Sequence, residues 1–422
     1  MKMIPFNIYL SAYIAIYVTS FALSVFIDWL NVKYLEKHGR KVPAAFEGMI
    51  DAGELKKISQ YTTDNIRFKR VESGMGKMFF LFIILSGILP WLAEAVNQQH
   101  FLLAGLLFFS VPGLVEAIAS LPFDYYHSFV LEEKYGFNTK TLTIWLADII
   151  KSFLIMIVLG AFLLSALLLM LKYAGPSWWI WAWIVLLMFQ LLMTILYPTV
   201  IAPIFNTFTP VKDGDLKTGI EKLAKGEGIN VAGIYQMDAT RRTRHTNAYL
   251  AGLGKAKRIV LFDSLIQGHD HEEILAILAH EIGHLKKNHI KKQLVVVSLV
   301  SLLLFYLASK LLVWDVMYTT FGFSIMPQYV GLFLVGILWG PLSFFLSPIG
   351  MALSRKYERE ADDYSQHALK TAKPLSKALK KMARENLSNL TPHPLYVCFN
   401  YSHPPLLERV ESLDKLDLNE KP

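Results

Sequence analysis

The chain has one cysteine, Cys398, among 422 residues. A lone cysteine excludes an internal disulfide framework and any multi-cysteine metal cluster. Charged residues are also scarce, at 18% of the chain, whereas 54% of the residues are hydrophobic and the mean hydropathy is +0.38. The sequence contains neither an internal repeat nor a low-complexity segment. Such a composition is too apolar for an ordinary soluble protein and predicts a membrane protein.

The net charge is positive, at +8, with an isoelectric point of about 9.2. A basic chain can bind nucleic acid, but in a membrane protein the commoner cause is lysine and arginine concentrated in cytoplasmic loops. Basic residues here gather between the apolar stretches. We therefore expect the lipid bilayer, and no nucleic acid, as a partner.

Seven stretches are long and apolar enough to cross a bilayer. They run approximately over Ile8–Ile27, Met78–Ala95, Phe101–Leu121, Ser152–Leu171, Trp178–Tyr197, Leu294–Leu312 and Val330–Ile349. The first is too long for a cleaved signal peptide and lacks a basic head and a cleavage site before Asp28. The C-terminus, Asp417 to Pro422, carries no lipidation or retention signal. The expected fold is therefore mostly α-helical and polytopic, with seven transmembrane helices.

Basic residues near the ends of these stretches predict the orientation in the membrane. The loop after the first stretch is rich in lysine and arginine from Lys33 to Arg70, whereas Val96–His100 has none and the loop after the fourth stretch has only Lys172. This alternation puts the N-terminus outside, and the long loop between the fifth and sixth stretches in the cytoplasm with the C-terminal tail. The sequence leaves open whether the membrane is a bacterial inner membrane or that of the endoplasmic reticulum.

Glu116 lies well inside the third stretch. An ionisable group at that depth should face a polar cavity or an ionic partner. A structural carboxylate and a functional one are equally compatible with the sequence, so the role of Glu116 stays open.

Two polar stretches remain for a catalytic body. We divide the chain into a membrane part (1–197), a first catalytic part (198–292), a transmembrane hairpin (293–350) and a second catalytic part (351–422). The first catalytic part is expected to hold three short strands followed by a helix. These elements are Gly233–Met237, Thr246–Gly252, Arg258–Ser264 and a helix from Glu272 to about Lys287.

The predicted helix contains the run His280-Glu281-Ile282-Gly283-His284. Residues four apart lie on one face of a helix, so the two imidazoles can bind a single zinc ion. Glu281 is turned about 100° around the helix, beside the open coordination position, where it can accept a proton from the attacking water. The alternative is a surface helix with two incidental histidines.

A catalytic zinc site needs a third protein ligand and keeps one position open. Sites with a third histidine on the same helix would need glycine and histidine where this chain has Lys287 and Ile290. His269 and His271 precede the helix and are weak candidates. His289 falls on the wrong face, as expected of a solvated helix end.

A downstream glutamate is the remaining common solution, and Glu358 and Glu360 lie on one predicted helix. Asp362 lies one turn beyond Glu358, where its carboxylate can orient a ligand imidazole. Glu360 points about 160° away from Glu358. The spacing favours Glu358 as the ligand but leaves Glu360 open.

The His280–His284 run, followed by Ser354-Arg355-x-x-Glu358-x-x-x-Asp362, resembles the type I CAAX prenyl protease family, integral-membrane zinc metalloproteases of the glutamate-zincin class. Further matches are Leu121–Phe123, Glu132–Asn138, Tyr197-Pro198, Ile201–Asn206, Asn247–Tyr249 and Asn400–Arg409. The resemblance implies that His280, His284 and Glu358 bind one zinc ion and that Glu281 is the general base. It also implies seven helices around an intramembrane chamber, with a gluzincin-like α+β catalytic part on the cytoplasmic side.

The resemblance places the segment from His403 to Arg409 at the active site. These two side chains are therefore candidate donors to the oxyanion of a tetrahedral intermediate. Asn247 and Ala248 lie on a predicted strand upstream of the zinc helix. An edge strand there can hold a substrate backbone by strand addition, and ordinary sheet structure is an equal alternative.

The sequence thus predicts an integral-membrane zinc metalloendopeptidase acting on CAAX-type prenylated C-terminal peptides or on membrane-protein substrates. Two alternatives are a transporter and a catalytically inert chaperone, each with a structural zinc. Both are disfavoured, because every group that peptide hydrolysis needs is present. The oligomeric state and the physiological substrate stay open.

Overall fold

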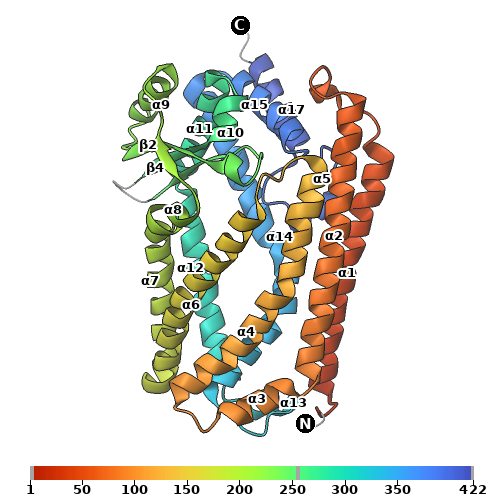
Figure 1. Ribbon diagram of the computed structural model, residues 1–422, viewed down its shortest axis with the longest axis vertical. Coiled ribbons are helices and arrows are strands. Elements are labelled where there is room, and N and C mark those ends of the chain that lie inside the picture. The colour runs from red at the N-terminus through yellow and green to blue at the C-terminus, as the bar shows by residue number, and fades with distance from the viewer. Residues whose placement is uncertain (1–3, 253–256, 420–422) are drawn as a thin grey trace.

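The computed structural model describes residues 4–252 and 257–419. The molecule is elongated and mostly helical (Figure 1). Long helices form its larger part, and a head of strands and shorter helices caps one end of them. The N-terminus lies at the end remote from the head, whereas the C-terminus lies at the head. Residues 420–422, part of the stretch in which the sequence analysis expects no lipidation or retention signal, lie outside the described residues.

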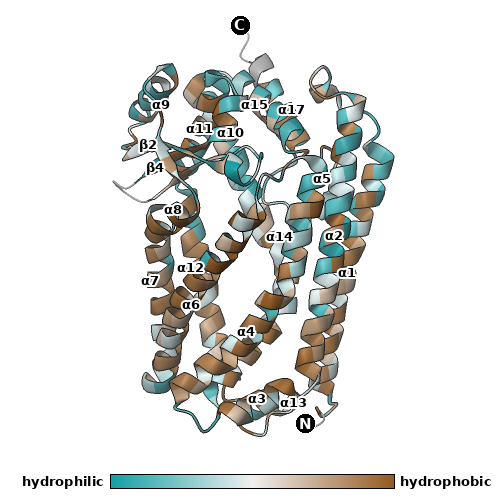
Figure 2. Ribbon diagram, in the orientation of Figure 1, coloured by the Kyte–Doolittle hydropathy of each residue, from teal (hydrophilic) through white to brown (hydrophobic). Residues whose placement is uncertain are grey.

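Six helices within the described residues are each long and apolar enough to cross a membrane. They are α1 (Ile8–His38), α4 (Phe101–Tyr126), α6 (Leu142–Tyr173), α7 (Trp178–Leu196), α12 (His289–Leu311) and α14 (Gln328–Leu369). Each coincides with a predicted stretch, and apolar residues predominate along them (Figure 2). Large apolar side chains such as Val158 and Ile349, 67% and 70% exposed, point away from the protein, as expected where lipid covers the helices. The prediction of a multi-pass membrane protein is confirmed.

The remaining predicted stretch, Met78–Ala95, is a bent pair of helices. α2 (Ala52–Leu85) ends inside it, and α3 (Ile88–Val96) continues at an angle of 58°. Gly87 between them has a φ of 78°, which glycine adopts without the steric cost that a Cβ would add. The part of the chain that the structure describes has seven candidate spans if this pair counts as one.

Glu116 lines a cavity of about 680 Å³ between α2, α4 and α14. Glu72 and Lys77 of α2 line the same cavity. Most of the other lining residues are apolar, so the expectation that Glu116 faces a polar cavity or an ionic partner stays a prediction, and its function stays open.

The head contains a four-stranded sheet of order β1-β2-β4-β3. The strands are β1 (Phe208–Pro210), β2 (Gly233–Met237), β3 (Ala248–Ala251) and β4 (Arg258–Phe262). β2 pairs parallel with β4, while β1 and β3 pair antiparallel at the two edges. Three strands lie within the predicted ones. β1 was not predicted, because a strand of only three residues that ends in proline shows no alternating pattern.

Shorter helices surround the sheet and join it to the membrane part (Figure 1). They are α5 (Glu133–Tyr135), α8 (Ala202–Phe205), α9 (Asp215–Gly226), α10 (Asp263–Gly268), α11 (His271–Lys286), α15 (Lys373–Glu385), α16 (Pro394–Asn400) and α17 (Leu406–Asn419). α13 (Asp315–Thr320) lies at the opposite end of the molecule, beside α3 (Figure 1). The π-helices η2 (His127–Glu132) and η4 (Tyr197–Ile201) prolong α4 and α7, and η1 (Ala44–Phe46), η3 (Gly175–Ser177) and η5 (Ala239–Arg241) are single turns. Leu261 of β4 and Ile274 and Leu278 of α11 are fully buried together in the core of the head.

α14 runs unbroken for 42 residues from the membrane part into the head. The predicted boundary at 350 falls inside this helix, and the division into four parts stays a prediction. In the head, α11 packs closely against α14. A Cβ on Gly283 of α11 would lie 3.1 Å from the Cα of Ala361 and 3.0 Å from the Cβ of Tyr364. Only glycine therefore lets the two helices approach this closely.

We predict that Gly283→Ala forces α11 away from α14. Overpacking of this kind costs about 1–3 kcal/mol, so the purified variant should unfold at a lower temperature than the wild type in detergent. Gly350→Ala in α14 is the matched control, because a Cβ there meets no atom within 4 Å. Equal unfolding temperatures for Gly283→Ala and Gly350→Ala would contradict the prediction.

Candidate metal centre

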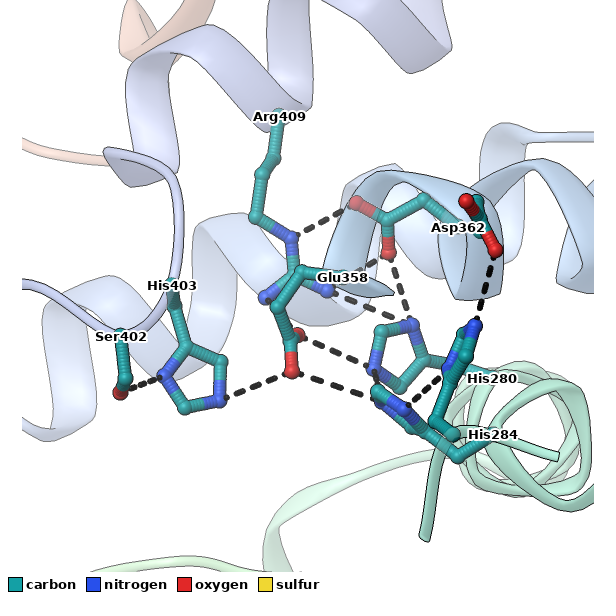
Figure 3. A network of polar contacts seen from close by, with 9 residues as sticks. His280, His284, Glu358, Asp362, Ser402, His403 and Arg409 are labelled. Carbon is teal, nitrogen blue, oxygen red and sulfur yellow. Dashed lines mark hydrogen bonds and ion pairs between the residues drawn. The ribbon is translucent and has the colours of Figure 1, made fainter. Parts of the chain in front are cut away.

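α11 presents two histidines on one face. Its start is fixed by a capping box, in which Asp270 accepts from the backbone N–H of Glu273 (2.9 Å) and Glu273 accepts from that of Asp270 (3.2 Å). The helix predicted from Glu272 to about Lys287 is confirmed. One turn apart within it, His280 and His284 bring their Nε2 atoms to 3.2 Å from each other (Figure 3).

α14 adds a carboxylate to this pair. Glu358 Oε2 lies 3.3 Å from His280 Nε2, and Glu358 Oε1 lies 3.4 Å from His284 Nε2. His280, His284 and Glu358, which we call the metal-binding group, offer ligand atoms that all lie within 4.8 Å of one another. Glu360, the alternative ligand in the sequence, contacts a different residue. Glu358 is therefore the glutamate that the structure places beside the two histidines.

The donor set fits a zinc ion. Zinc binds imidazole nitrogen and carboxylate oxygen at about 2.0–2.2 Å, so two ligand atoms of a tetrahedron lie about 3.3–3.6 Å apart. The separations of 3.2, 3.3 and 3.4 Å are close to this value. Glu358 is only 6% exposed, and its buried Oε2 has ion-pair contacts with His280 and Arg409 but no hydrogen bond among the described residues. A buried carboxylate oxygen without a hydrogen bond is costly, and a bound cation removes that cost.

His280 is oriented from behind by Asp362, as the sequence predicts. His280 Nδ1 lies 2.8 Å from Asp362 Oδ1. Arg409 in turn donates from Nε and Nη2 to the two oxygens of Asp362, at 2.8 and 2.6 Å (Figure 3). Burial lowers the pKa of His280, but its contacts with Asp362 and Glu358 outweigh burial and raise that pKa to about 9. The surroundings of His280 thus favour a positive charge, which suits a metal cation.

His284 is oriented by His289, which the sequence predicted to be a solvated helix end. His289 Nδ1 lies 2.9 Å from His284 Nδ1, and His289 Nε2 lies 2.9 Å from Glu360 Oε2. His289 is 3% exposed, and its ring stacks on Tyr357 at 4.3 Å. The prediction of a solvated helix end is therefore wrong.

The error has a local cause. α11 ends at Lys286, and Asn288 adopts a positive φ of 56° before α12 starts at His289. Helical periodicity therefore does not continue from His284 to His289, and the break between the helices places His289 against the site. His269, the other buried histidine near α11, contacts Glu273 and Glu385 instead of the metal-binding group.

A cavity of about 480 Å³ opens in front of the metal-binding group. Glu281 lines it beside His280 and Glu358, as expected for a group that acts on bound substrate. Burial raises the pKa of the Glu281 carboxyl, and the two neighbouring imidazoles oppose that shift. A raised pKa suits a carboxylate that has to accept a proton and release it again.

Asn247 and Ala248 line the same cavity from the sheet. Ala248 is the first residue of β3, an edge strand that pairs only with β4 among the described residues. The strand predicted upstream of the zinc helix is thus an edge strand beside the metal-binding group. Asn247 Oδ1 accepts from the backbone N–H of Ala248 at 2.9 Å.

His403 reaches the cavity from the opposite side. Its Nε2 lies 3.3 Å from Glu358 Oε1, its Nδ1 lies 2.9 Å from the hydroxyl of Ser402, and the side chain is 62% exposed. Arg355 holds this segment against α14 by donating from Nη1 to the carbonyls of Val397 and Tyr401.

Two family models match the chain. The model described as CAAX prenyl protease N-terminal, five membrane helices, matches residues 31–207, and that of peptidase family M48 matches residues 210–417. The chain is 35% identical to a CAAX prenyl protease 1 homolog of Dictyostelium discoideum, over 96% of this chain and 97% of the relative. It is 32% identical to CAAX prenyl protease 1 of Saccharomyces cerevisiae, over 99% of this chain and 97% of the relative.

The fold is also that of a solved relative. The crystal structure of Ste24p from S. mikatae is 30% identical to the chain and superposes on it with a TM-score of 0.91, covering 97% of this chain and all of that one. Membrane part and head are therefore both shared. The chain belongs to peptidase family M48, together with the CAAX prenyl proteases, and is a multi-pass membrane metallopeptidase.

Proposed function

We propose that the protein is a zinc metalloendopeptidase that hydrolyses CAAX-type prenylated C-terminal peptides. The observation that carries the proposal is the convergence of three groups on one cavity. These are the ligand atoms of His280, His284 and Glu358 within 4.8 Å of one another, the Glu281 carboxyl, and the β3 edge at Ala248. A metal-binding group, a base and a backbone-binding edge are what hydrolysis of a peptide bond requires.

His280, His284 and Glu358 would hold the ion. Bound there, zinc supplies Lewis-acid polarisation of the scissile carbonyl and of the attacking water. Asp362 and His289 keep the two imidazoles in the orientation that turns Nε2 toward the ion.

Glu281 accepts the proton of the attacking water and passes it to the leaving amine. His403, whose exposed imidazole faces the cavity, donates to the oxyanion that develops on the scissile carbonyl. Arg409 is buried, and two of its nitrogens are engaged by Asp362. In the proposal these two nitrogens hold Asp362, and through it His280, while Nη1, which lies 3.8 Å from Glu358 Oε2 at the cavity, is placed to donate to the oxyanion.

The substrate backbone lies along β3. The free edge of this strand offers N–H and C=O groups to an extended peptide, which it can bind as an added strand. Asn247, at the start of that edge, is placed to contact a peptide group of the substrate.

The names of the relatives, CAAX prenyl proteases, support the substrate class. Cleavage of other membrane proteins is the second candidate, because the cavity lies beside helices that cross the bilayer. A transporter or an inert chaperone is less compatible with membership of a peptidase family. The positive-inside pattern supports a head, and hence an active site, on the cytoplasmic side.

We predict that Glu281→Gln keeps its zinc and lowers kcat by about 100- to 10,000-fold, the usual contribution of a general base. Glu272→Gln is the control, since Glu272 lies on the same helix and is exposed. Metal content comes from elemental analysis and kcat from peptide cleavage. Wild-type turnover in Glu281→Gln would remove Glu281 from the mechanism.

The two glutamates of α14 should differ in their effect on metal binding. Glu358→Ala removes a ligand and should leave the purified protein nearly free of zinc. Glu360→Ala removes the support of His289 and should retain one zinc per chain, bound about 10- to 100-fold more weakly. Competition with a chelator measures the zinc affinity of both variants. Full zinc occupancy in Glu358→Ala would show that Glu358 is not a zinc ligand.

The substrate is tested with a farnesylated CAAX peptide and the same peptide without the lipid. We expect purified protein in detergent to cleave the farnesylated peptide, to lose this activity with a zinc chelator, and to regain it when zinc is restored. Equal cleavage of both peptides would favour the broader class of membrane-protein substrates. Cleavage that survives complete zinc removal, or cleavage of neither peptide, would overturn the proposal.

A further inference from the structure

His245, three residues before the start of the edge strand β3, lies outside the metal centre but contacts both the membrane part and the cavity wall. Its Nε2 is 3.1 Å from Glu132 Oε2 at the end of η2, and its Nδ1 is 2.9 Å from Asn386 Oδ1, just beyond α15. The ring stacks on buried Phe137 with centroids 4.1 Å apart. It therefore joins three segments that are far apart in the sequence.

Asn386 ties the same arrangement to the edge strand. Its Oδ1 accepts from the backbone N–H of Thr246 at 3.2 Å, and its Nδ2 donates to the Thr246 hydroxyl at 3.4 Å. Asn386 and Asn247 both line the cavity in front of the metal-binding group. The contacts of His245 thus reach two walls of that cavity.

The hydrogen-bond directions are determined by the partners. Since the N–H of Thr246 can only donate, the Asn386 atom that faces it is the oxygen, and His245 Nδ1 has to donate to that oxygen. His245 Nε2 faces a carboxylate, which also accepts, so both ring nitrogens carry hydrogen and the imidazole is cationic. Glu132 is held in turn by the Tyr61 hydroxyl of α2, which donates to Oε1 at 2.7 Å.

The backbone reinforces this link. The segment after η2 pairs with the lead-in to β3 through an isolated bridge between Asn138 and Thr243, and the N–H of Arg244 donates to the carbonyl of Phe137 at 3.1 Å. The Ser264 hydroxyl donates to the carbonyl of His245 at 2.9 Å. The end of the α4 membrane helix is thereby fastened to the start of the substrate-binding edge.

We propose that His245 is a positioning residue for peptide binding, which holds the β3 edge and Asn386 in register with the metal-binding group by anchoring both to Glu132. This inference rests on the proposed function. His245 does not face the cavity itself and acts through the residues that do. Strand addition binds the peptide in the ground state and in the transition state alike, so loss of the anchor raises KM and changes kcat little.

The test compares His245→Ala, Glu132→Gln and the control His127→Ala in the full-length protein with the farnesylated CAAX peptide. His127 is matched because its imidazole also lies near Glu132, at 3.9 Å. We expect His245→Ala to raise KM about tenfold, as for loss of a hydrogen bond to a charged group. Its kcat should stay within about threefold and its zinc content should equal that of the wild type, while His127→Ala behaves as wild type. Glu132→Gln should raise KM less than His245→Ala does. A variant that combines both substitutions should have a KM no higher than that of His245→Ala alone, because both remove the same contact.

An unchanged KM in His245→Ala, or a loss of zinc and kcat together, would overturn the inference. If His245→Ala fails to fold, the volume-conserving Glu132→Gln decides, and an unchanged KM there overturns it. Binding of a fluorescent farnesylated peptide, measured in the Glu281→Gln background, gives the same comparison without turnover. If the wild type cleaves no peptide, that result counts against the proposed function. Weaker peptide binding on removal of His245 still supports this inference, and equal binding refutes it.

Discussion

The close contact between α11 and α14 is the constraint on which the candidate site depends. The two imidazoles come from α11 and the carboxylate from α14, and metal ligation tolerates only a few tenths of an ångström in their separation. Gly283 makes that approach possible, because any side chain there would meet the backbone of Ala361. α11 is also packed into the core of the head through Ile274 and Leu278. The same helix therefore fixes the metal-binding group and the sheet relative to each other.

The two candidate ligand histidines would reach the same tautomer through different partners. An imidazole that binds metal through Nε2 must carry its hydrogen on Nδ1. On His280 this hydrogen points to the Asp362 carboxylate, whose charge is balanced by Arg409. On His284 it points to His289 Nδ1, which must then be an acceptor, so His289 carries its hydrogen on Nε2 and donates to Glu360. Behind His280 the contacts end in a buried ion pair, whereas behind His284 they pass through a neutral ring to a more exposed carboxylate.

Local regularities of the sequence predicted much of this architecture. Apolar stretches located the membrane helices, and alternation located β2 to its end residues. The spacing of His280 and His284, and of Glu358 and Asp362, predicted which side chains share a helix face, because each pair lies within one uninterrupted helix. The helix breaks at Gly87 and Asn288 and the short β1 depend on local backbone conformations, which carry no periodic pattern. The contact of His245 with Asn386 joins residues 141 apart, and only the tertiary fold brings them together.

Both halves of the candidate site are built on membrane helices. Glu358 is carried by α14, which passes from the membrane part into the head without a break, so the carboxylate moves with a helix embedded in the bilayer. The β3 edge is fastened through His245 to Glu132, at the end of the π-helix that prolongs α4. A head joined to its membrane part by flexible loops would leave the height of the cleft above the bilayer variable. Here the cleft is tied to the ends of the membrane helices, which suits the proposed substrate, whose cleavage site an attached lipid would hold close to the bilayer.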